Sequence, residues 1–146
     1  MPVIGVRMDK IEAERKENVA IEGQMRISPV PRILQVQETQ IPGPTGKINV
    51  VEVQFEYNTS YDPPVGEIKV IGAILFQESE KNRQQLLKDW KDKRQLSPDI
   101  GRDIVYRMTN HSFLVMMNLA RELNLPSPMP LRIQTQTEEP GDAAAS

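Results

Sequence analysis

The sequence predicts an α+β fold, in which an antiparallel sheet of four or slightly more strands carries two C-terminal helices packed on one face. Two observations predict this arrangement. From Val3 to Gln77 apolar and polar residues mostly alternate, as they do in half-buried strands. After Gln77 the apolar residues recur at three- and four-residue steps, which is the spacing of one face of a helix.

Short alternating segments mark the first strands. In "VIGVRM" and "NVAIEGQMRI" apolar residues recur at every second position, so each segment has one face for a core. The next segment, "ISPVPRILQVQETQ", contains two prolines, which cannot donate a backbone hydrogen bond to a neighbouring strand. We therefore expect it at a sheet edge or in a crossing segment, with "IPGPTGK" as the loop after it.

The two strongest strands are "INVVEVQFEY" and "GEIKVIGAILFQ", and they are predicted to form a central hairpin of residues 47–57 and 66–77. The first strand has one apolar face and one face of Glu and Gln. The second half of the other strand is apolar on both faces, because Ile71, Ala73 and Leu75 alternate with further apolar residues. A single helical layer covers only one of these faces, so either a second subunit or a loop of the chain must cover the other.

Two helices are predicted after the sheet. Ser79 is the expected N-cap of a surface helix whose few apolar residues form a narrow stripe. Ser97 and Pro98 begin a second helix, which should end at Asn124 or Leu125 because Pro126 follows. This helix carries two apolar stripes, more than packing on one sheet requires, so the surplus should face a partner subunit or a ligand.

The C-terminal region divides into a proline-rich strip and a polar tail. Prolines at every second position keep "LPSPMPLRI" extended, and such a strip has little chain entropy to lose when it docks. We expect one domain over residues 1–134 and a disordered tail over residues 135–146, whose sequence is polar and contains proline and glycine.

Composition and motifs argue against several functions. The net charge of −2 gives no basic excess for nucleic acid, and the chain has no cysteine and only one histidine, His111. Asp99 and Asp103 suit the start of a helix, and the glycines have no phosphate-binding spacing. We therefore expect no enzyme activity, no cofactor and no metal. No segment is long and apolar enough for a membrane span, and we expect a cytoplasmic protein.

The order of the predicted elements resembles the SecB-type export chaperones and their archaeal relatives. An edge strand, a crossing segment and the hairpin "INVVEVQFEYNTSYDPPVGEIKVIGAILFQ" precede a short helix and a long helix that ends in "ARELNLPSPMPLRI". The resemblance covers roughly Val3 to Ile133. It implies a four-stranded antiparallel sheet with a helical layer, assembled as dimers of dimers that hold unfolded polypeptide in apolar grooves.

These observations lead us to expect a chaperone-like protein that binds unfolded or extended polypeptide in apolar grooves of a homo-oligomer, a dimer or a tetramer. A non-catalytic scaffold subunit of a larger complex is the alternative, and an enzyme built around His111 is a third, weaker one. The expected polypeptide-binding residues are Leu34, Val36, Tyr61, Met116, Met117 and Met129, and the expected oligomer interface comprises Ile71, Ala73, Leu75, Val105 and Phe113.

Overall fold

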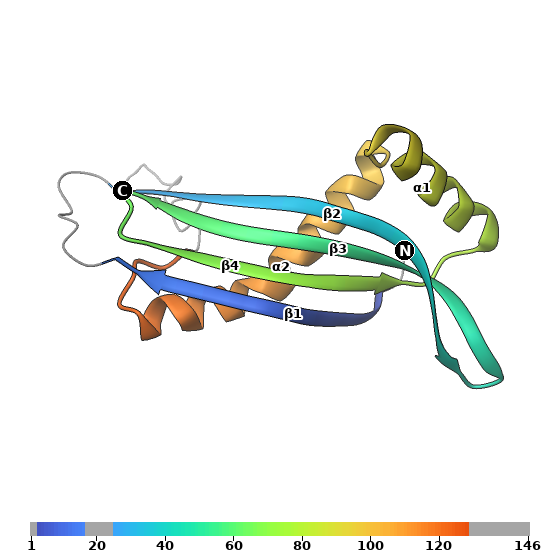
Figure 1. Ribbon diagram of the computed structural model, residues 1–146, viewed down its shortest axis with the longest axis horizontal. Coiled ribbons are helices and arrows are strands. Elements are labelled where there is room, and N and C mark those ends of the chain that lie inside the picture. The colour runs from blue at the N-terminus through green and yellow to red at the C-terminus, as the bar shows by residue number, and fades with distance from the viewer. Residues whose placement is uncertain (1–2, 17–24, 129–146) are drawn as a thin grey trace, which may run out of the picture.

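The computed structural model describes residues 3–16 and 25–128, which form one sheet and two helices (Figure 1). The strands are β1 (Val3–Arg15), β2 (Arg26–Gly43), β3 (Gly46–Asp62) and β4 (Gly66–Phe76), and the helices are α1 (Glu80–Lys93) and α2 (Pro98–Glu122). The sheet is antiparallel with the strand order β1-β4-β3-β2. The predicted fold class is therefore confirmed. Residues 17–24 and the predicted tail lie outside the described residues.

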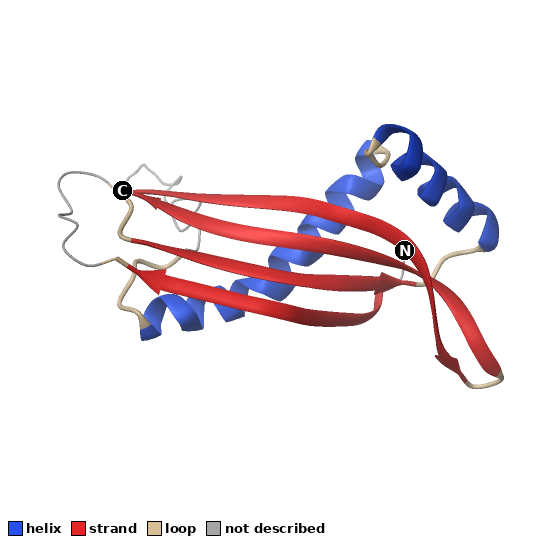
Figure 2. Cartoon of the chain, in the orientation of Figure 1, coloured by secondary structure: helices blue, strands red, loops and turns tan. Residues whose placement is uncertain are grey.

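β3 and β4 form the centre of the sheet, as the sequence predicted. Val51 pairs with Phe76 and Ser60 with Glu67, so the hairpin is continuous from its turn to the end of β4. β2 is an edge strand, which was one of the two alternatives that its prolines predicted, and it pairs with β3 along its whole length. Between Gly46 and Val50, β3 has only β2 as a neighbour. The turn end of the β2–β3 hairpin therefore extends past the rest of the sheet as a two-stranded ribbon (Figure 2).

β1 closes the other edge by pairing with β4, and its ladder is irregular at two places, one of them between Met8 and Lys10. Gly72 lies opposite Met8 at this irregularity. A Cβ atom at Gly72 would stand 2.3 Å from the backbone oxygen of Arg7, so only glycine allows β1 to approach β4 this closely.

Both helices begin where their capping residues predicted. The hydroxyl oxygen of Ser79 accepts a hydrogen bond from the backbone N–H of Asn82, and Pro98 occupies the first turn of α2. After α2 the chain turns, and the N–H of Leu125 donates to the carbonyl of Ala120 over 2.8 Å. The phenolic hydroxyl of Tyr61 on β3 then donates to the carbonyl of Pro126 over 2.6 Å, which holds the strip after the helix against the sheet.

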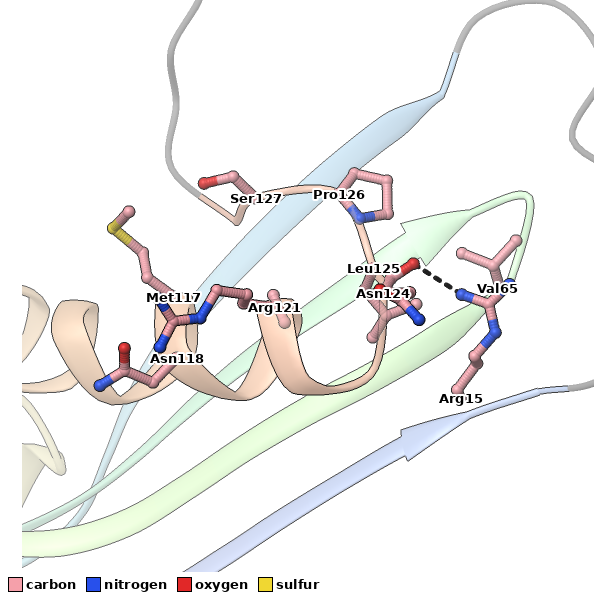
Figure 3. Close-up of a pocket in the computed structure, with 10 residues that line it drawn as sticks. Arg15, Val65, Met117, Asn118, Arg121, Asn124, Leu125, Pro126 and Ser127 are labelled. Carbon is pink, nitrogen blue, oxygen red and sulfur yellow. Dashed lines mark hydrogen bonds between the residues drawn. The ribbon is translucent and has the colours of Figure 1, made fainter.

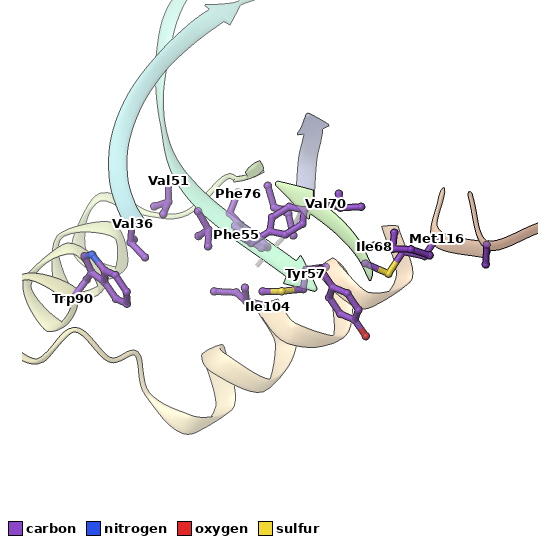
Figure 4. Packing of buried hydrophobic residues seen from close by; sticks show 14 of the residues in the cluster. Val36, Val51, Phe55, Tyr57, Ile68, Val70, Phe76, Trp90, Ile104 and Met116 are labelled. Carbon is purple, nitrogen blue, oxygen red and sulfur yellow. The ribbon is translucent and has the colours of Figure 1, made fainter. Parts of the chain in front are cut away.

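One hydrophobic core fills the space between the helices and one face of the sheet (Figure 4). α2 crosses this face diagonally, whereas α1 packs beside β2, and side chains of both helices belong to the same cluster. Trp90 on α1 donates from its indole nitrogen to the side-chain oxygen of Gln35, and Arg83 bonds Glu38, so α1 also protects the β2 edge. Fully buried members of the core include Phe55, Ile68, Ile74, Phe76, Ile104 and Met108.

The opposite face of the sheet carries a polar network across three strands. The Oε2 atom of Glu52 accepts hydrogen bonds from Arg7, Gln37 and Gln54 at 3.2, 3.3 and 3.0 Å. These contacts bury Glu52, and hydrogen bonds to Asp9 and Glu52 raise the pKa of the Arg7 guanidinium above its usual value. Within one chain this face is therefore already partly covered by its own polar side chains.

Candidate functional site

The flank of α2 beside its buried line is only partly covered by the rest of the described chain. The buried residues of α2 step by four from Ile104 to Ala120. The residue after each of them lies about 100° further around the helix, at the border between the core and solvent. We give the name α2 side strip to the half-buried residues at steps of four from Gly101 to Met117; the strip comprises Gly101, Val105, Thr109, Phe113 and Met117, and the last four each follow a buried residue.

A shallow depression opens beside the start of this strip and has a volume of about 580 Å³. It is lined almost entirely by apolar groups from β2 and from the first turns of α2. A Cβ atom at Gly101 would meet nothing within 4 Å, so the helix backbone is open to contact there. This N-terminal depression is lined by Ile33, Pro98, Gly101, Arg102, Val105 and Tyr106.

A second pocket, of about 600 Å³, lies at the other end of the strip (Figure 3). Met117, Leu125 and Val65 give it apolar walls, and Ser127 and Pro126 come from the strip that follows the helix. The guanidinium of Arg15 donates to the carbonyls of Leu123 and Asn124 at 3.1 and 2.6 Å, which satisfies carbonyls at the C-terminus of α2. We call this the C-terminal pocket.

The two hollows are connected along α2 by the α2 side strip, which winds about 160° around the helix between Gly101 and Met117. Gly101 and Val105 line one and Met117 lines the other, and all three belong to the α2 side strip. Gly101 and Met117 are separated by about 24 Å along the helix axis, so an extended chain that joins the two hollows needs at least about seven residues. The arrangement suits a ligand that is long, extended and largely apolar.

Two large apolar side chains project from α2 into solvent. Tyr106 is 66% exposed and Leu114 is 67% exposed. Each lies two positions after a buried residue, and therefore about 200° around the helix from the core. Neither residue was among the predicted site residues, because neither belongs to the apolar stripes by which the helix was interpreted.

The predicted polypeptide-binding residues divide between the core and the surface. Val36, Tyr61 and Met116 are buried, and the sulfur of Met116 accepts a hydrogen bond from the hydroxyl of Thr59. Burial raises the pKa of the Tyr61 hydroxyl to about 12. Leu34, at an irregularity of the β2 ladder, is 36% exposed, and Met117 lines the C-terminal pocket. Met129 lies outside the described residues.

The predicted interface residues lie on two separate surfaces. Ile71, Ala73 and Leu75 are on the sheet face away from the helices, where Ala73 is fully buried and the other two are half-buried. Val105 and Phe113 belong to the α2 side strip. One flat contact with a partner therefore cannot use all five.

The described residues offer little for catalysis. His111 is exposed on α2, and Asp99 and Asp103 form ion pairs with Arg102 and Arg107 on the same helix. No group of three or more His, Cys, Asp or Glu side chains within residues 3–16 and 25–128 could hold a metal ion. Of the helices in this part of the chain, neither is long and apolar enough to cross a membrane.

Comparison of the chain with protein-family models, with curated proteins and with solved structures found no match.

Proposed function

We propose that the protein binds unfolded or extended polypeptide along the α2 side strip, in the manner of a chaperone that holds its client without chemistry. The observation that carries this proposal is the exposure of two large apolar side chains on α2: Tyr106, which lines the N-terminal depression, and Leu114, about two turns further along the helix. Together with the half-buried α2 side strip, they give one helix apolar side chains that the described part of the chain leaves uncovered. The resemblance in layout to SecB-type chaperones supports the same proposal. We propose a cytoplasmic location as part of it.

Apolar burial is the driving force of this proposed binding. Each client side chain that is fully covered contributes about 1.5–3 kcal/mol before the cost of ordering is subtracted. A few shallow contacts are then enough for micromolar affinity. Because apolar area does not depend on which side chain supplies it, the strip accepts many sequences, and the flexible side chain of Met117 adapts to them.

Light scattering during aggregation of a chemically unfolded client tests the proposal. The unmodified protein should slow aggregation, and the double variant Tyr106→Ser/Leu114→Ser should lose most of this effect. Both side chains are exposed, so the fold should survive, and circular dichroism checks that it does. Asn110→Ser is the matched control, because Asn110 is exposed on the same helix and carries no apolar surface.

The alternative is a scaffold subunit in which the same apolar side chains are covered by a fixed partner. In calorimetry the proposed function predicts binding to several unrelated unfolded clients with a negative heat-capacity change. If none of them binds, the chaperone proposal is wrong and the scaffold function takes its place.

We also propose that the protein assembles as a homo-oligomer through β1. The two edges of the sheet differ: β2 carries prolines and is protected by α1, whereas β1 is a 13-residue edge strand without proline. Ile11 on β1 is 45% exposed. A long edge strand without proline leaves its outer backbone groups available for pairing with another strand.

Antiparallel pairing of two β1 strands about a twofold axis at Ile11 is self-complementary. It places Ile11 opposite its copy and Lys10 of each chain opposite Glu12 of the other. Within one chain, Lys10 and Glu12 already form an ion pair at 3.5 Å. Ile11→Lys should produce monomers in sedimentation velocity, because two like charges would lie directly opposite each other. Val30→Lys on the protected β2 edge is the control and should leave assembly unchanged.

A further inference from the structure

The C-terminal pocket has a chemistry of its own that sets it apart from the N-terminal depression. Its described lining contains the guanidinium groups of Arg15 and Arg121 and no acidic side chain. Arg15 is engaged with backbone carbonyls, whereas Arg121 is exposed and has no ion pair with another described residue. No described carboxylate therefore forms an ion pair with either of these two guanidinium groups.

Apolar walls lie directly beside these charges. Leu125 and Ala120 line the pocket and are buried, and Met117, half-buried, lies near Arg121 (Figure 3). A ligand that fits both parts carries apolar side chains followed by carboxylates.

The protein's own sequence continues with such a segment. The described chain leaves the pocket at Pro128, one residue after Ser127 on the pocket wall. Residues 129–146 read "MPLRIQTQTEEPGDAAAS", with apolar residues at alternate positions first and the acidic residues Glu138, Glu139 and Asp142 later. Ten residues of extended chain reach about 33 Å, so Glu138 can return to Arg121 without strain.

We propose that the C-terminal pocket is a docking site for the protein's own segment 129–146, with its carboxylates paired with Arg121 and Arg15. A tethered segment meets its site at an effective concentration in the millimolar range, so weak contacts are enough for partial occupancy. The docked segment covers one end of the α2 side strip and competes with a client there. This regulatory consequence rests on the proposed function, whereas the docking itself does not.

Paramagnetic relaxation in the full-length protein tests the docking. The chain contains no cysteine, so Ala143→Cys places a single nitroxide label beside the acidic residues. The label should broaden the amide signals of Val65, Met117 and Arg121 and leave those of Val105 and Tyr106 sharp. Absence of broadening around the pocket would overturn the proposal.

Charge reversal identifies the contact. Glu138→Lys/Glu139→Lys should remove the broadening, and adding Arg121→Glu should restore it, because the charges are then exchanged. Arg102→Glu is the control for helix charge, since Arg102 lines the other hollow, and it should change nothing. Broadening that persists in the Glu138→Lys/Glu139→Lys variant would show that the acidic residues do not hold the segment, and the proposal would be wrong.

A mixed sample separates docking within one chain from docking between copies. Isotope-labelled protein without nitroxide is mixed with unlabelled protein that carries it. Docking within a chain predicts sharp pocket signals in this mixture, and broadened signals there would replace the proposal by exchange between copies.

Client affinity then measures the regulation. Glu138→Lys/Glu139→Lys should bind an unfolded client about three- to tenfold more tightly than the unmodified protein, because the site is no longer partly occupied. Equal affinities would contradict the competition. If no client binds to either protein, the proposed function fails, and the relaxation experiment alone decides the docking.

Discussion

Arg83 on α1 donates a 2.6 Å hydrogen bond from its Nε atom to the carboxylate of Glu38 on β2, and its guanidinium also reaches the carbonyl of Glu78. The Arg83 side chain is almost completely buried, although it belongs to a helix with few apolar residues. Leu86 and Trp90 provide the apolar part of the same contact. A charged pair therefore helps to fix the position of α1 against the edge of the sheet.

The first prediction concerns this pair. Arg83→Ala should lower the free energy of unfolding by about 1.5–3 kcal/mol, because it removes charge-assisted hydrogen bonds in a largely buried place. Urea unfolding followed by Trp90 fluorescence measures the change. Arg102→Ala removes an exposed ion pair with Asp99 and should cost less than about 1 kcal/mol. Equal losses in the two variants would contradict the special position of Arg83.

The second prediction compares two glycines. Gly72→Ala should destabilise the protein by about 2 kcal/mol or more, because the new Cβ atom meets the backbone oxygen of Arg7 at 2.3 Å. Gly101→Ala should instead stabilise it by about 0.5–1 kcal/mol, because its Cβ meets nothing and alanine suits a helix interior. Thermal unfolding of both variants measures the opposite shifts, and two shifts of the same sign would refute the argument.

The third prediction concerns Ser112, whose hydroxyl is fully buried on α2 without a hydrogen-bond partner among the described residues. Ser112→Ala should leave stability unchanged or raise it by about 1 kcal/mol, because no bond is lost and a buried polar group is removed. Ser112→Leu should destabilise, since it enlarges a fully buried side chain. Chemical denaturation checks both. A clear loss in the alanine variant would reveal a partner for the hydroxyl.

The fourth prediction concerns pH. The pKa of Tyr61 is raised by burial from about 10 to about 12, so the folded state favours the neutral phenol. The corresponding stability is fully present below pH 10 and is lost as the pH rises towards 12. Unfolding experiments between pH 9 and 11.5 should show a steeper alkaline loss for the unmodified protein than for Tyr61→Phe. Absorbance titration near 295 nm should show one phenol ionising late, and this late step should vanish in the variant.

The features that could be predicted from the sequence are those that depend on local spacing. Alternation marked both central strands, and Ser79 and Pro98 marked the helix starts. The pairing of β1 with β4 could not be predicted in the same way, because nothing local specifies a partner so far along the chain. The position of α1 beside β2 likewise depends on Arg83 and Glu38, which are ordinary surface residues in the sequence.

The candidate site could be predicted only in part. The sequence showed that α2 carries more apolar surface than one sheet can cover, and the structure places Met117 at a pocket but Met116 in the core. The buried line passes from Ile104 to Ala120 in steps of four, and each step rotates it about 40° around the helix. It therefore moves from one apolar stripe to the other as the helix crosses the sheet. Which residues of α2 are buried therefore depends on the direction in which the helix crosses the sheet. That direction is fixed only when the helix and the sheet pack together, so it could not be predicted from local spacing.

The position of β1 has a consequence for how the protein forms during synthesis. Of the four strands, β1 leaves the ribosome first. Val3 pairs with Phe76 and Arg15 with Gly66, so β1 cannot join the sheet until β4 has been made. The hairpins of β2 with β3 and of β3 with β4 join neighbours in the chain and close short loops, whereas β1 closes a long one. The nascent three-stranded sheet therefore offers the exposed side of β4 until β1 arrives. A newly made copy nearby presents the same open side, so we expect exchange of β1 between chains to be the main misfolding route of this topology.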